Sequence, residues 1–171
     1  MLSTTLIERW VLNASPLIVL ARVGLADLPL SLAAQVVVPR PVADEIQAGP
    51  TPEPARLALA AGGFTIVDPP PPSPELLAWD LGRGETAVLS WALAEKGWTC
   101  ILDDAEARKC ARAFSVPVKG TLALILSAKL CGIIPSAAEI IQTLVSMGFR
   151  LDERMVREVL ARVVGETWPP E

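Results

Sequence analysis

Short apolar runs, each followed by a helical segment, recur along this chain and constrain its fold more than any other feature. We expect short apolar strands at residues 10–12, 36–38, 64–67, 99–102 and 116–118, with the third of them at an edge of the sheet. Their apolar residues are continuous rather than alternating, which is typical of strands covered on both faces. Because parallel strands need crossover helices, the pattern predicts a three-layer α/β/α fold with a mostly parallel central sheet of about five strands.

Proline, glycine and capping residues mark the helices expected between these runs. Ser15 as N-cap and Pro16 at the first helical position are predicted to open the first helix, which Gly24 ends. The glycines at 82 and 84 predict a flexible loop, and residues 69–74 a stiff proline-rich surface loop. Further helices are expected at residues 41–48, 54–61, 85–96, 105–114, 121–130, 135–147 and 152–164.

Length and composition favour one folded domain. We predict a single domain over residues 1–171, with a core in about residues 10–150 and a C-terminal helix at about 152–164. Hydrophobic residues make up 51% and charged residues 20%, which excludes a disordered chain or a coiled coil. The apolar stretches are too short to cross a bilayer, and no signal peptide is recognisable, so we expect a cytoplasmic protein without membrane contact.

The residue types that are missing exclude several kinds of active site. The chain has no histidine, so it cannot build a Ser-His-Asp triad or a histidine general base. Cys100, Cys110 and Cys131 lack paired spacing, so we expect small buried residues rather than a zinc cluster or a disulfide framework. The net charge of −4 argues against a protein that coats nucleic acid, but not against a nuclease whose carboxylates are offset by bound metal.

Polar and acidic side chains stand where the predicted strands end and helices begin. Asn13 follows the first strand, Asp103 and Asp104 follow the fourth, and Glu45 and Glu85 start helices. Ligands of open α/β sheets bind outside the carboxyl ends of the strands, so we expect these side chains to face one crevice. Carboxylates without histidine suit Mg²⁺ or Mn²⁺, and phosphodiester hydrolysis is a common reason to gather them. Helix capping and the helix dipole are the structural alternatives for the acids.

Four motifs follow one another in the order and spacing of a known family. The four motifs are Asn13-Ala14-Ser15-Pro16-Leu17-Ile18, Pro39-Arg40-Pro41-Val42-Ala43-Asp44-Glu45, Gly82-Arg83-Gly84-Glu85 and Asp103-Asp104-Ala105-Glu106-Ala107-Arg108. Over about residues 10–150, the chain resembles PIN-domain proteins, specifically a bacterial and archaeal group similar to the toxin ribonucleases of toxin–antitoxin pairs. Residues 118–121 and 130–135 also resemble this group.

The resemblance implies a Mg²⁺- or Mn²⁺-dependent ribonuclease that hydrolyses RNA with a metal-activated water. Its implied partners are RNA and a cognate antitoxin protein, and the mean hydropathy of +0.44 adds the expectation of an apolar homodimer interface. The implied catalytic residues are Glu45, Glu85, Asp103 and Asp104. The implied metal ligands are Asn13, Glu85, Asp103 and Asp104, with the choice between the two aspartates left open. The predicted substrate contacts are Ser15, Arg108, Lys119 and Thr121. For Arg108, an ion pair with Glu85 or Asp104 that orders the site is an equally open alternative.

Asn13 stands where the family pattern has Asp. An amide offers a neutral oxygen, so a divalent ion loses one ligand charge. Two interpretations remain open: the site binds metal with reduced activity, or the chain has lost catalysis and serves as a nucleic-acid- or protein-binding module. A phosphatase-like or nucleotide-binding fold is disfavoured, because the chain lacks a P-loop, a G-x-G-x-x-G motif after a strand and a D-x-D nucleophile motif.

Overall fold

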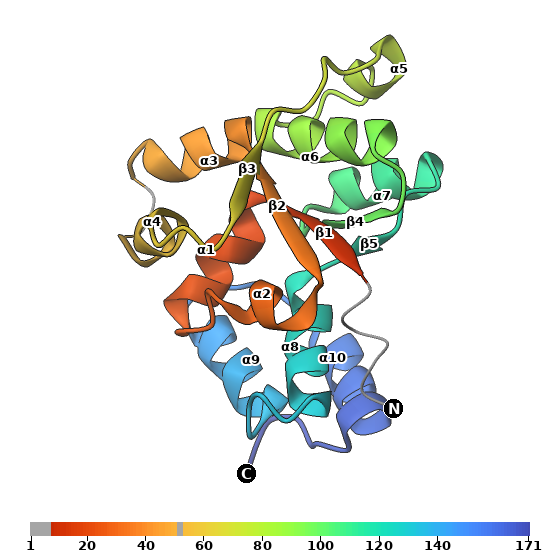
Figure 1. The fold of residues 1–171 in the computed structure, drawn as a ribbon. Helices are drawn as coiled ribbons and strands as arrows, with labels where there is room; N and C mark the ends of the chain where they lie inside the picture. Colours follow the sequence, from red (N-terminus) through yellow and green to blue (C-terminus); the bar gives the residue numbers. More distant parts are fainter. Residues whose placement is uncertain (1–7, 51–52) are drawn as a thin grey trace. The chain divides into compact units, whose positions relative to one another are not determined.

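Five parallel strands form one sheet with the order β3-β2-β1-β4-β5 in the computed structural model, which describes residues 8–50 and 53–171 (Figure 1). This confirms the predicted sheet and shows that all of its neighbouring strands run parallel. The edge position predicted for the third strand is also correct. The strands are β1 Arg9–Leu12, β2 Gln35–Pro39, β3 Thr65–Val67, β4 Trp98–Ile101 and β5 Val118–Lys119.

The central strands are apolar because both faces of the sheet are covered. Trp10, Val11 and Leu12 of β1 are at most 1% exposed, and all four residues of β4 are buried. The β-branched valines of β2 are buried as well. Cys100 and Cys110 are buried as predicted, whereas Cys131 is half-buried. Burial of this continuous apolar layer therefore fixes the positions of the strand ends and of the residues that follow them.

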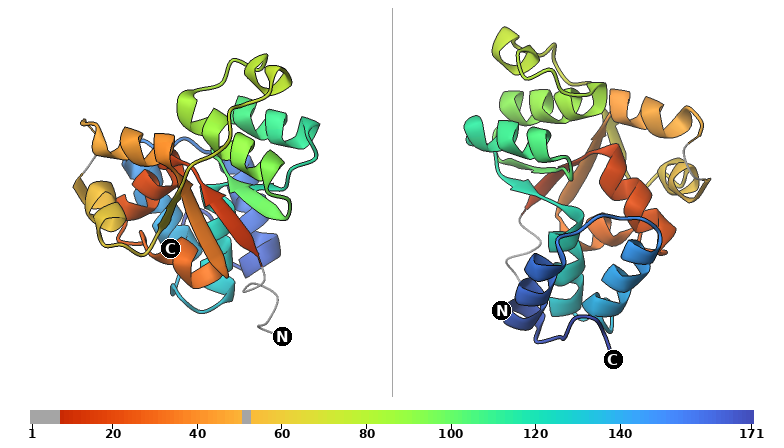
Figure 2. Two further views of the ribbon diagram at one scale, coloured as in Figure 1. Left: turned by 45° about the horizontal axis from the view of Figure 1, so that its top comes forward. Right: turned by 180° about the vertical axis from the view of Figure 1, so that it is seen from behind.

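Helices cover both faces of the sheet, giving the three layers of an α/β/α fold (Figures 1 and 2). Right-handed crossovers put the helices that follow β1 and β2 on one face, and those that follow β3 and β4 on the other. The first group comprises α1 Ala14–Arg22, α2 Leu28–Leu32, α3 Arg40–Gln47 and α4 Glu53–Ala60. The second group comprises α5 Pro74–Leu77, α6 Arg83–Ala94 and α7 Ala105–Ala113.

The strand order reverses between β1 and β4, which are neighbours in the sheet although 85 residues separate their ends Leu12 and Trp98. Helices diverge to opposite faces at such a switch point and leave a crevice outside the carboxyl ends of the two strands. Asn13 follows β1 directly, and its backbone N–H donates to the carbonyl of Ile101 at 3.2 Å. Asn13 and Asp103 therefore stand at the carboxyl ends of the two strands that flank the crevice.

The chain divides into two compact units, Met1–Thr121 and Leu122–Glu171, which we describe separately. The first unit contains the sheet and every candidate site residue. The second is helical, and the prediction of one domain for the whole chain stays a prediction. The helices beyond α7 are α8 Thr121–Leu130, α9 Ala137–Ser146, α10 Glu153–Val159 and the π-helical turn Leu160–Val164.

The starts of α1, α6 and α9 differ from the predictions; α9 begins at Ala137 with Ser136 as its N-cap, not at Pro135. Asn13, not Ser15, is the N-cap residue of α1, and its side chain makes no capping bond because it turns toward Glu85 instead. Helix α6 begins at Arg83, so the predicted Gly82–Gly84 loop is wrong: Gly82 is the N-cap and Gly84 lies inside the helix. The predicted cap of the C-terminal helix is correct, because Asp152 accepts from the N–H groups of Arg154 and Met155.

Candidate functional site

Three predicted site residues converge on Gly84 in the first turn of α6. The Nδ2 atom of Asn13 donates to Oε1 of Glu85 over 3.2 Å. A Cβ atom added to Gly84 would lie 2.8 Å from Oε2 of Glu45 and 2.9 Å from Oδ1 of Asn13. Only glycine leaves room for these oxygens against the helix backbone. We call Asn13, Glu45 and Glu85 the Gly84 cluster.

Asn13 contributes one satisfied and one unsatisfied polar atom to this cluster. The residue is 2% exposed, and its Oδ1 is buried without a hydrogen-bond partner among the described residues. A buried carbonyl oxygen without a donor is costly, and such atoms are rare in folded proteins. This oxygen therefore marks the position where a cation or another hydrogen-bond donor would be most stabilising.

Glu45 lies on α3, and its Oε2 atom approaches Gly84 of α6. Burial, and then the negative charge of Glu85, raise the pKa of the Glu45 carboxyl. The residue as a whole is exposed, but its carboxyl end lies against buried Gly84, which explains the desolvation. Two neighbouring carboxylates that repel each other are a common feature of sites that bind cations.

Asp103 and Asp104 both serve helix starts. Asp103 accepts from the N–H of Thr121 at 2.8 Å and from its Oγ1 at 2.6 Å, which ties the end of β4 to the first residue of α8. Asp104 is the N-cap of α7 and accepts from the N–H of Ala107 at 2.9 Å. The capping alternative considered for this pair is therefore realised, and Asp103 is the less exposed of the two carboxylates.

The predicted substrate contacts are engaged by the protein or lie apart from the Gly84 cluster. Arg108 donates to the carbonyl of Leu102 at 3.0 Å, beside Asp103 and Gly120. The Lys119 ammonium pairs with Glu8, the residue before β1, at 2.8 Å. Thr121 is fully buried against Asp103, and Ser15 is exposed in the first turn of α1. Whether any of them contacts a substrate stays a prediction.

A hollow of about 390 Å³ adjoins the Gly84 cluster between the ends of α3 and α6. Arg83 and Gly84 both line it, although neither was predicted as a site residue. The signal was the glycine directly before Glu85, which we interpreted as a loop residue instead of as a close-approach position. The lining residues are Pro41, Asp44, Glu45, Ala48, Gly82, Arg83, Gly84 and Glu85.

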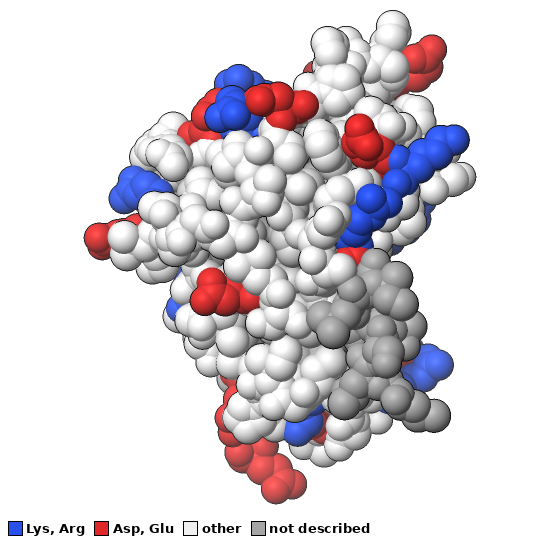
Figure 3. All heavy atoms as spheres, viewed as in Figure 1, with Lys and Arg blue, Asp and Glu red and all other residues white. Residues whose placement is uncertain are grey.

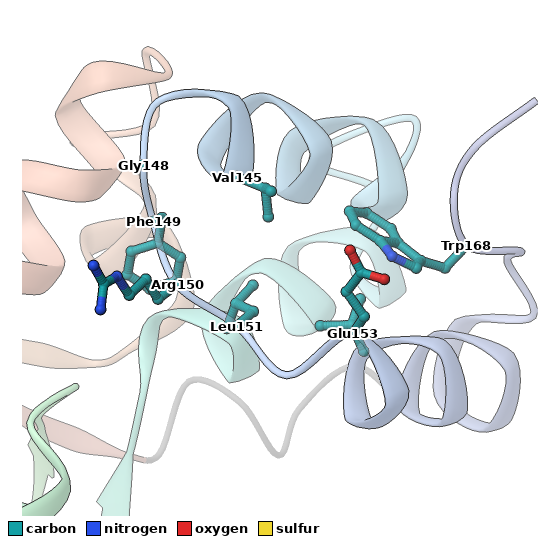
Figure 4. A pocket seen from close by; sticks show the side chains of 8 residues that line it. Val145, Gly148, Phe149, Arg150, Leu151, Glu153 and Trp168 are labelled. Atoms are coloured by element: carbon teal, nitrogen blue, oxygen red, sulfur yellow. The ribbon is translucent and has the colours of Figure 1, made fainter.

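The second unit has a hollow of its own, of about 550 Å³ (Figure 4). Val145 of α9, Leu151 and the indole of Trp168 form mainly apolar walls, and the Glu153 carboxylate lies beside the indole. Figure 4 shows the Arg150 guanidinium pointing away from Trp168. None of the acidic residues predicted for the site lies here, so the Gly84 cluster is the better candidate for chemistry.

Comparison with protein families matches residues 9–165 to the PIN domain. The chain belongs to the PIN-domain family. This match spans both compact units, and it agrees with the sheet and with the acidic residues at its carboxyl edge. PIN domains are nuclease-type modules that in general depend on divalent metal ions. A search of curated proteins found no match.

The candidate donor atoms are of the type that a divalent metal ion prefers, but too few of them lie together to hold one. All candidate atoms are carboxylate or amide oxygens, the ligands that Mg²⁺ and Mn²⁺ prefer. Among residues 8–50 and 53–171, however, no group of three or more acidic or cysteine side chains is arranged to hold a metal ion. The reason is visible in the contacts: two carboxylates meet at Gly84, while Asp103 and Asp104 are committed to helix starts. No helix in this described part is long and apolar enough to span a membrane.

Proposed function

We propose that this PIN domain is a Mg²⁺- or Mn²⁺-dependent ribonuclease that acts in the cytoplasm. The observation that carries the proposal is the convergence of Asn13, Glu45 and Glu85 on Gly84, with a buried amide oxygen that lacks a partner. Glu85 and the Asn13 oxygen are the proposed ligands, with Asp103 added from the neighbouring strand end. Glu45, whose pKa is raised by burial and by Glu85, is a catalytic carboxyl group in this proposal.

The chain's own residues have defined tasks in this proposal. A bound divalent ion supplies the activated water and polarises the scissile phosphate. Asn13 holds Glu85 in position through its amide, and Thr121 does the same for Asp103. No histidine is needed, because the carboxylates bind the ion and the water is the nucleophile.

The test compares hydrolysis of a fluorescent single-stranded RNA by the wild type and by Glu85→Gln, with Mn²⁺, Mg²⁺ or EDTA. We expect cleavage with either metal, none in EDTA, and a loss of at least about 100-fold in Glu85→Gln, as for removal of one group that stabilises a transition state. Metal-independent cleavage, or full activity of Glu85→Gln, would contradict the proposal.

One observation favours a second candidate, a binding module without catalysis. The amide of Asn13 donates to Glu85 and Thr121 donates twice to Asp103, so both acids are stabilised without any metal. A wild type that binds RNA but neither binds Mn²⁺ in calorimetry nor cleaves RNA supports this candidate. Metal binding by Asn13→Asp alone would mark the site as a degenerate one.

The proposed partners follow from the same assignment. A toxin role implies a cognate antitoxin protein, which a small neighbouring gene would supply. For a homodimer, support comes from exposed apolar side chains, because such groups favour burial between subunits. Five of the seven large apolar residues that are exposed in the described part belong to the second unit: Leu130, Ile133, Met147, Met155 and Val163. Light scattering of the purified protein tests the dimer.

A further inference from the structure

Arg83 lines an acidic hollow together with Asp44, Glu45 and Glu85. Within residues 8–50 and 53–171, no hydrogen bond or ion pair engages the Arg83 guanidinium, although three carboxylates line the same space. A guanidinium that forms no pair with acids so close by remains available for an anion from outside.

Three other cations in the described part of the first unit are engaged by protein groups. Arg40 forms an ion pair with Asp68 at 2.5 Å, Arg108 donates to a backbone carbonyl, and Lys119 pairs with Glu8 while lying over the Trp10 ring. On the face seen in Figure 3, basic and acidic side chains are mixed over a largely uncharged surface. A polyanion that meets this face finds local contacts instead of a continuous basic groove, so an arginine that no described residue pairs with can contribute measurably to its binding.

The start of α6 adds to the attraction of this position for an anion. The helix has 12 residues, and its N-cap Gly82 contributes no capping side chain. The first-turn N–H groups and the helix dipole give this end a partial positive charge. The Oδ1 atom of Asn13, which is buried and has no hydrogen-bond partner among the described residues, lies next to Gly84 in this turn. A cation or a hydrogen-bond donor would stabilise this oxygen. The arrangement suits a phosphodiester, because its negative oxygens can contact Arg83 while a cation lies next to the carboxylates.

We propose that Arg83 binds a backbone phosphate of a single-stranded RNA whose scissile group lies in the hollow beside Glu45 and Glu85. The guanidinium presents a planar fork of donors that matches two phosphate oxygens, which a lysine cannot reproduce. This inference rests on the proposed function, because it names the residue that holds the substrate of that site. It also reassigns substrate contact from Arg108 and Lys119 to a residue that the sequence motifs left unassigned.

The test is fluorescence anisotropy with a labelled single-stranded RNA of about 12 nucleotides, within the range of sites on such proteins. Binding is measured in Ca²⁺, which occupies carboxylate oxygens, and a denaturing gel checks that the RNA stays intact. The variants are Arg83→Ala and Arg83→Lys. The matched control is Arg22→Ala, which removes an exposed arginine at the far end of α1. Thermal melts verify that all variants fold.

We expect Arg83→Ala to weaken binding about tenfold, as for loss of one charged hydrogen-bonded contact. The slope of log K against log salt should become less steep by about 0.7, the value for one phosphate contact on a single strand. Arg83→Lys should recover part of the affinity, and Arg22→Ala should behave as the wild type. In Mn²⁺, the KM for cleavage should rise in Arg83→Ala more than kcat falls.

Two failures are distinguishable. Wild-type affinity and salt slope in Arg83→Ala would overturn the role of Arg83 while leaving the nuclease proposal intact. A wild type that neither binds nor cleaves the RNA would overturn both. If the wild type binds RNA without cleaving it, a tenfold effect of Arg83→Ala still supports the inference, and only the catalytic part of the proposed function fails.

Discussion

Replacing Asn13 by Asp probes the site most directly, because the change keeps the side-chain shape and alters only its chemistry. In the native protein, the Asn13 amide donates to Glu85 over 3.2 Å. Asn13→Asp removes this donor and puts a carboxylate oxygen in its place. The position is 2% exposed, so water screens the new charge poorly.

The expected cost follows from the geometry. Two unit charges 3.2 Å apart repel by ~5 kcal/mol at an effective dielectric constant of about 20. Loss of a hydrogen bond to a charged group adds about 1.5 to 3 kcal/mol, whereas rotation of half-buried Glu85 toward solvent relieves part of the repulsion. We therefore expect Asn13→Asp to lose roughly 3 to 5 kcal/mol of unfolding free energy at pH 7 in EDTA.

Urea and thermal unfolding followed by circular dichroism measure this loss, which corresponds to a Tm lower by roughly 10 °C. Protonation at about pH 4 should return part of the stability, because it removes the repulsion. Mn²⁺ should stabilise Asn13→Asp more than the wild type, since the variant offers one more ligand charge. The control is Gln35→Glu, the same amide-to-acid change at an exposed position at the amino end of β2.

Equal unfolding of Asn13→Asp and Gln35→Glu in EDTA at pH 7 would contradict this expectation. That result would mean that the contact between Asn13 and Glu85 contributes nothing in solution. An equal loss at pH 4 and pH 7 would also count against it, because the cost would then come from packing and not from charge.

Substitutions at three further positions test the same site and its supports. Glu45→Gln should be more stable than the wild type at pH 7 but equal to it at about pH 3. The raised pKa means that the folded state holds the Glu45 proton more tightly, so stability falls as pH rises from 4.5 toward the folded pKa; equal urea midpoints at pH 7 would contradict this. A glycine-to-alanine change in a helix normally raises the free energy of unfolding by about 1 kcal/mol. In Gly84→Ala, however, the new Cβ would meet oxygens at 2.8 and 2.9 Å. We therefore expect overpacking to leave a net loss of about 1 kcal/mol of unfolding free energy, measured in thermal melts. Asp104→Ala should cost about 1 kcal/mol through loss of the α7 cap, and Asp104→Asn much less, in urea titrations; a matching loss in both variants would show that capping is not its role.

The order and type of most elements are predictable from the sequence pattern. Continuous apolar runs such as those of β2 and β4 are typical of strands buried on both faces, so their alternation with helical segments predicts a parallel sheet between helix layers. The order of the motifs was sufficient to suggest the PIN family, which the match over residues 9–165 confirms. The cap at Asp152 was predicted, and capping was the alternative for Asp104, because capping is a local interaction between residues close in sequence.

Only the tertiary structure decided how the acidic residues are used. Asn13 and Glu85 are 72 positions apart, and no local pattern reveals that the amide of one satisfies the carboxylate of the other. The same holds for Asp103 and Thr121, 18 positions apart, and for Gly84, whose role depends on two side chains from other elements. Side-chain direction and burial arise from packing across the switch point between β1 and β4, where strands distant in sequence meet. Among the described residues, that packing also leaves Arg83 without a hydrogen bond or ion pair in a hollow that three acidic residues line, in contrast to Arg108 and Lys119.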